Sequence, residues 1–121
     1  MTLLVQPYRR GPNGELLSLD VTPSPPHNEL AGFEASRREL WGAPVMHRLG
    51  LRLLPSLAEQ DLYVEGEQLD QLEAELETIL ASIPKLASAT HYGEDFIRFR
   101  VGNIAEAVRL ARAAGGGVYI G

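Results

Sequence analysis

Cysteine is absent from the sequence, and no apolar stretch approaches the roughly 20 residues that are needed to span a bilayer. The lack of cysteine excludes a disulfide framework, a zinc site built on thiolates and catalysis by a thiol. The N-terminal segment MTLLVQPYRR differs from a signal peptide, because its two arginines follow the short apolar run instead of preceding it. We therefore expect a cytoplasmic protein.

Basic residues are also scarce, and they are unevenly placed. The 121 residues carry a formal charge of −5, and residues 53–84 hold eight acids with no Lys or Arg. An acidic chain without a basic stripe disfavours binding to nucleic acid or to an anionic membrane, because both depend on neutralising phosphate. The length fits a single domain over residues 1–121, large enough to fold without a metal or a disulfide.

Two apolar runs on either side of a turn rich in Gly and Asn predict a β-hairpin at the start of the chain. Its strands are Thr2–Tyr8 and Glu15–Val21, joined by the turn-forming sequence Gly-Pro-Asn-Gly. Prolines in residues 23–26 end the second strand. Asn28 is a candidate N-cap, which predicts a helix over Glu29–Trp41.

The middle of the chain contains the clearest helical pattern. Apolar residues recur at spacings of three and four over Glu67–Ile83, where Pro84 ends the predicted helix. A short strand over Leu62–Val64 precedes it. The residues before that strand predict only short elements: two helical turns, over Pro44–Leu49 and Pro55–Gln60, and between them a strand over Leu51–Leu54.

The last third of the chain predicts a strand, a helix and a strand. Phe96–Val101 alternates, Asn103 is a candidate cap for a helix that extends through Ala114, and Val118–Ile120 is apolar. Such a unit places its strands parallel through a right-handed crossover, or antiparallel as the alternative. The predicted fold class is α+β, with a small mixed or antiparallel sheet packed by two to three helices and a C-terminal β-α-β unit.

Few local motifs point to chemistry. The three glycines at 115–117 follow a helix, whereas a phosphate loop precedes one, so they are interpreted as a helix cap and a turn. The three histidines show no metal-binding spacing, and we expect no metal and no cofactor. The densest polar cluster is His91, Glu94 and Asp95, followed by Arg98 and Arg100 on one face of the predicted strand. These five residues are candidates for a proton-transfer or anion-binding site, or form an ordinary polar loop and sheet surface.

The acidic helix is the strongest indication of a partner. Asp70, Glu73 and Glu77 repel one another at helical spacings, and a concentrated negative face speeds association with a basic protein. A solvated face that maintains solubility is the plainer interpretation. The sequence therefore favours a protein-binding module that is not an enzyme, such as a bacterial inhibitor or immunity protein, using this acidic face.

Two alternatives remain open at the sequence level. The first is a small enzyme or ligand-binding protein with a site around His91, Glu94, Asp95 and Arg98. The second is a structural homo-oligomer in which the strand Val118–Ile120 forms an exposed edge and pairs across a two-fold axis.

Overall fold

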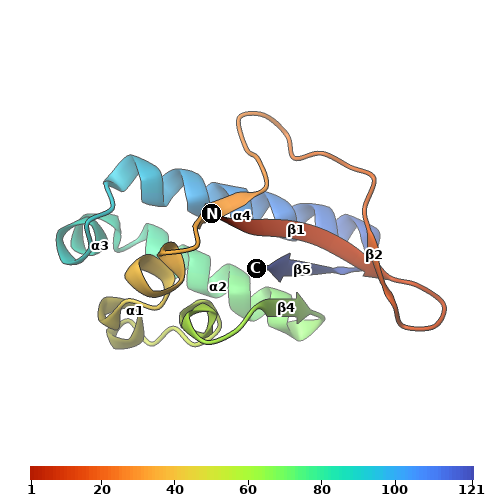
Figure 1. Cartoon of the computed structure of the whole chain (residues 1–121), viewed down its shortest axis with the longest axis horizontal. Helices are drawn as coiled ribbons and strands as arrows, with labels where there is room; N and C mark the ends of the chain where they lie inside the picture. Colours follow the sequence, from red (N-terminus) through yellow and green to blue (C-terminus); the bar gives the residue numbers. More distant parts are fainter.

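The computed structural model describes residues 1–121 and shows an α+β fold with one antiparallel sheet (Figure 1). The sheet order is β2-β1-β5-β4, and β3 pairs with β1 on the edge that β2 also uses. The five strands are β1 (Thr2–Arg10), β2 (Leu16–Ser18), β3 (Leu30–Phe33), β4 (Leu62–Glu65) and β5 (Gly117–Ile120). The predicted α+β class and antiparallel sheet are confirmed.

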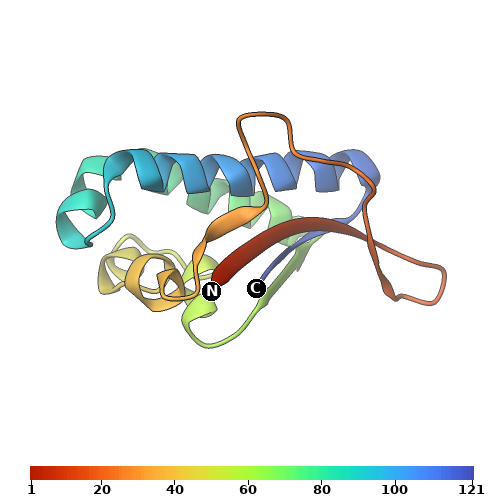
Figure 2. The ribbon, with the colours of Figure 1, turned by 45° about the horizontal axis from the view of Figure 1, so that its top comes forward.

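Four α-helices and two short helical turns make up the rest of the fold. The α-helices are α1 (Pro44–Arg48), α2 (Glu67–Leu80), α3 (Ile83–Ala89) and α4 (Glu94–Ala114). A π-helical turn η1 (Arg37–Trp41) precedes α1, and a 3-10 turn η2 (Leu54–Ala58) follows it. Figure 2 shows α2 and α4 running along the same face of the sheet. No helix of the structure has both the length and the apolar character required to cross a membrane.

The predicted strand over Phe96–Val101 is wrong, because these residues form the first turns of α4. The buried residues Ile97, Val101 and Ile104 continue at spacings of four and three through Val108 and Ala111, which is the helical period. Asn103 accordingly lies inside a helix and caps nothing. The predicted β-α-β unit is therefore replaced by a long helix followed by one strand.

The predicted helix over Glu29–Trp41 is also wrong in its first half. Asn28 accepts a hydrogen bond from the backbone N–H of Leu30 and so supports a local turn, while Leu30–Phe33 pairs with β1 as β3. The short strand expected over Leu51–Leu54 is absent. The helix expected over Glu67–Ile83 ends earlier, at Leu80, and Pro84, which was expected to end it, lies in the first turn of α3 instead. The hairpin is confirmed, although its second strand covers only Leu16–Ser18, and the strands at Leu62–Val64 and Val118–Ile120 are also confirmed.

The predicted exposed edge at Val118–Ile120 is wrong, since β5 lies between β1 and β4 (Figure 1). The edge strand is β4 instead. Strand alternation gives the sheet one aliphatic face, which packs against α2 and α4. Its residues Val5, Leu62, Val64, Val118 and Ile120 are each at most 5% exposed.

Candidate functional site

Three tyrosines lie on the sheet face opposite the helices, and we call Tyr8, Tyr63 and Tyr119 the tyrosine face. Tyr63 pairs with Tyr119 across β4 and β5, and their ring centroids are 5.1 Å apart. The Tyr8 ring from β1 meets Tyr63 edge-on at 6.4 Å. Each tyrosine alternates with the buried aliphatic residues of its own strand, so the pleat of the sheet aims all three to the same side.

Two of the three phenols are fixed by carboxylates. Tyr8 donates a hydrogen bond of 2.6 Å to Glu65, which also accepts from Arg10 at 3.3 Å. Tyr119 donates to Asp61 at 3.2 Å, and Asp61 accepts a 2.6 Å bond from Arg37. Burial, followed by the neighbouring carboxylate, raises the pKa of both phenols.

A glycine allows Tyr8 to cross the sheet. A Cβ atom at Gly117 would lie 2.6 Å from the Tyr8 hydroxyl and 2.6 Å from the carbonyl oxygen of Val64. The absence of a side chain there lets the phenol reach across β5 to Glu65 on β4, and the hydrogen bond from Tyr8 is the largest influence lowering the pKa of Glu65. The tyrosine face is thus rigid at both ends.

The middle ring, Tyr63, is the accessible one. It is 50% exposed, and its hydroxyl makes no hydrogen bond within the protein. Beside it lies a groove of about 350 Å³, which we call the tyrosine groove. The three tyrosines line it together with apolar residues of β2 and of the loop that follows β2, which we call the loop wall, and Glu29 is the only charged residue in the lining.

The loop wall of the groove is held in place from the helix side. Asn103 on α4 accepts the backbone N–H of Asn28 and donates to the carbonyl of Leu30. Glu106, also on α4, accepts the backbone N–H of Ser24 at 2.7 Å. Residues of this loop therefore line the groove from a fixed position.

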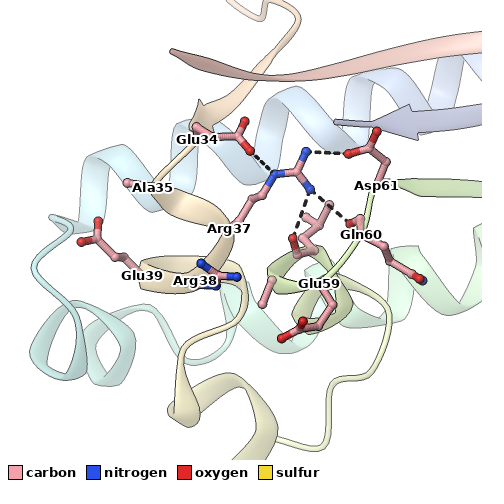
Figure 3. A pocket seen from close by; sticks show the side chains of 10 residues that line it. Glu34, Ala35, Arg37, Arg38, Glu39, Glu59, Gln60 and Asp61 are labelled. Atoms are coloured by element: carbon pink, nitrogen blue, oxygen red, sulfur yellow. Dashed lines mark hydrogen bonds and ion pairs between the residues drawn. The ribbon is translucent and has the colours of Figure 1, made fainter.

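A second and larger cleft, of about 610 Å³, lies between η1 and η2 (Figure 3). Figure 3 shows Arg37 extended at its centre between Glu34 and Asp61, whereas Glu39 points away from it. Arg37 also donates to the carbonyls of Leu57 and Gln60 at 3.1 and 3.2 Å. The N–H groups of Arg37 are already used to hold η1 against the segment before β4. Arg37 therefore has little remaining hydrogen-bonding capacity for a ligand in this cleft.

The predicted acidic face is partly neutralised by residues from elsewhere in the chain. Asp70 and Glu73 both pair with Arg112 of α4, at 2.8 and 3.4 Å. Glu75 is buried and accepts three backbone N–H groups, from residues 52–54, at 2.8 to 3.0 Å. Glu77 is exposed and has no ion-pair partner, so it is the predicted partner-binding residue whose charge stays unopposed.

The structure does not gather the other predicted cluster into one site. His91 is exposed and lies 3.5 Å from Glu39 of η1, while Glu94 and Asp95 are exposed in the first turn of α4. Arg98 and Arg100 are two residues apart on a helix, so their directions differ by about 160° and they do not share a face.

Arg100 is directed toward β3. Its guanidinium lies over the rings of Phe96 and Phe99, at 4.8 and 5.4 Å from their centroids, and donates to the carbonyl of Leu30 at 3.3 Å. Its Nε is buried without a partner, and burial lowers the pKa of this arginine. No group of three His, Asp or Glu side chains comes together as a metal site.

Sequence reasoning missed all three tyrosines of the tyrosine face. The signal that points to them is the repeated pattern aliphatic–Tyr–aliphatic, in Leu62-Tyr63-Val64 and again in Val118-Tyr119-Ile120. Comparison with known protein families, with curated proteins and with solved structures finds nothing that matches this chain. The site must therefore be interpreted from its own geometry.

Proposed function

We propose that the protein is a non-enzymatic binding module that docks a protein partner on its tyrosine face. The observation that carries this proposal is Tyr63, a half-exposed ring with a free hydroxyl, held between two rings that carboxylates fix. Tyrosine is enriched in protein interfaces because it combines a large apolar surface with a polar tip. A ring that is already ordered loses little conformational entropy on binding.

The partner fits best as a basic protein. The net charge of −5 and the exposed acids Asp70, Glu73 and Glu77 on α2 favour encounter with a positive surface. Arg112 offsets part of that face, so we assign α2 a role in attraction and the tyrosine face the role of contact. An inhibitor or immunity protein that occludes a basic enzyme would have this form.

Capture of partners from native lysate, at low and at high salt, tests the proposal. The bait is the full chain, compared with Tyr63→Ser and with a matched control, Phe33→Ser. Phe33 is equally exposed, at 52%, and stacks on Phe96 of α4, away from the groove. We expect a salt-sensitive partner that Tyr63→Ser loses and Phe33→Ser retains. A partner whose binding is the same with all three baits would contradict the proposal.

A further inference from the structure

We propose that the tyrosine groove binds a cationic side chain, lysine or arginine, carried by the partner's docking segment. This inference rests on the proposed function and adds the chemistry that the groove recognises. The faces of aromatic rings carry negative charge density and attract cations within about 6 Å of the ring centre. Tyr63 and Tyr119 present two such rings 5.1 Å apart beside the groove.

The charges around the groove select the same ligand. Glu29 is the only charged residue in its lining, is half-buried and has no ion-pair partner. Arg10, beside the Tyr8 ring, is already paired with Glu65, and Arg37 is paired with Asp61, the carboxylate that Tyr119 also contacts. An incoming anion would therefore face an unopposed carboxylate, whereas an incoming cation would gain one.

The protein itself contains this type of contact. The Arg10 guanidinium lies 5.5 Å from the centroid of the Tyr8 ring, at the end of the same tyrosine face. Tyr63 and Tyr119 have no such cation of their own. A partner's lysine or arginine would repeat at these two rings the packing that Arg10 makes at Tyr8.

The apolar part of the lining suits the aliphatic part of such a side chain. Leu16 and Val21 are 42% and 48% exposed and line the same groove as the rings. Lysine and arginine bury their methylene stems against apolar surface while the charged head stays near polar groups. A volume of about 350 Å³ is at the lower end of ligand pockets, which matches one long side chain better than a large ligand.

Blocked tripeptides test the inference directly. The probes are N-acetyl, C-amide forms of Gly-Lys-Gly, Gly-Arg-Gly, Gly-norleucine-Gly and Gly-Glu-Gly, titrated into the full chain while NMR follows the ring signals of Tyr63 and Tyr119. We expect the lysine and arginine peptides to shift these signals. They should bind at least about fivefold more tightly than the norleucine peptide, whose side chain has the methylene stem without the charge. Glu29→Gln and Tyr63→Ala should each weaken the lysine peptide by about two- to fivefold, and Phe33→Ala should leave it unchanged.

The outcomes separate this inference from the proposed function. Equal binding of the lysine and norleucine peptides, or tighter binding of the glutamate peptide, overturns the cation site. If no peptide shifts the ring signals while Tyr63→Ser still abolishes capture of the partner, the cation site fails and the docking function stands. If the lysine peptide binds as expected but Tyr63→Ser captures the partner normally, the site is correct and the docking function fails.

Discussion

The two faces of the sheet are built by the same strands and differ in almost every chemical respect. Toward the helices, β4 and β5 present Leu62, Val64, Val118 and Ile120, all nearly inaccessible to solvent. Toward the other side, the intervening positions of the same strands present Tyr63 and Tyr119. The carboxylates of Asp61 and Glu65, at either end of β4, accept hydrogen bonds from Tyr119 and Tyr8. Burial of the first face drives folding, while the second combines apolar area with hydrogen-bonding tips, the composition expected of a binding surface.

The largest expected effect comes from the covered face. Leu62→Ala should lower the free energy of unfolding by about 2–5 kcal/mol, because it leaves a cavity between the sheet and α2. The adjacent substitution Tyr63→Ala removes a larger side chain but should cost about 1 kcal/mol or less, since that ring is 50% exposed. Chemical denaturation of both variants measures the contrast. Equal losses would mean that the tyrosine face is part of the folding core.

The next effect is expected at Glu106, which connects α4 to the loop that lines the tyrosine groove. Glu106 on α4 is buried, and hydrogen bonds from Arg109 and then from the Ser24 N–H lower its pKa to about 2. Because the folded-state pKa is depressed, its contribution to stability is present above the ordinary value of 4.5 and is lost as the pH falls from 4.5 toward 2. Glu106→Gln should lower stability at neutral pH by about 1–2 kcal/mol and flatten this acid loss.

Denaturation of Glu106→Gln at several pH values below neutral checks that expectation, with Glu77→Gln as the control on an exposed carboxylate without a partner. Glu106→Gln should also loosen the loop that carries Val21 and Glu29 in the lining of the groove. An acid dependence that Glu106→Gln leaves unchanged would remove Glu106 as its source.

The contrast between the faces also explains what the sequence could predict. Strands β1, β4 and β5 are each a short run rich in aliphatic residues and tyrosine that a glycine follows, so local pattern suffices to find them. The proximity of the three tyrosines cannot be predicted in this way, because it depends on which strands pair. Tyr8 reaches Glu65 only because β5, from the far end of the chain, lies between their strands.

Two of the wrong predictions have different physical causes. Over Phe96–Val101 the residues alternate as in a strand, and only extension to Ala111 reveals the helical stripe. Gly102 resembles a break, yet it sits inside α4 where a Cβ would lie 2.5 Å from the His27 ring. At Leu30–Phe33 the pairing with β1 overrides a local sequence that looks like the start of a helix.

A similar effect is expected at Tyr8, which belongs to the uncovered face but is only 4% exposed. Tyr8→Phe should cost about 1–2 kcal/mol through loss of the hydrogen bond to Glu65. Because burial and Glu65 raise the pKa of this phenol, its contribution is present below the ordinary value of 10.0 and is lost as the pH rises above it. The wild-type chain should therefore lose stability in alkali more steeply than Tyr8→Phe. Parallel alkaline losses would remove Tyr8 as their source.

The smallest effect on stability is expected at Glu29, and it tests whether a carboxylate beside the tyrosine face contributes to folding as a buried one does. Glu29 lines the tyrosine groove without an ion-pair partner, so Glu29→Gln should change the free energy of unfolding by no more than about 0.5 kcal/mol. Glu75→Gln is the matched comparison, since that carboxylate is buried and accepts three backbone N–H groups, and its loss should cost about 2 kcal/mol. Denaturation curves of the two variants decide whether the Glu29 charge is free to serve a partner. A loss at Glu29 as large as at Glu75 would show that the fold already uses this carboxylate, leaving less of its charge to attract a cation into the groove.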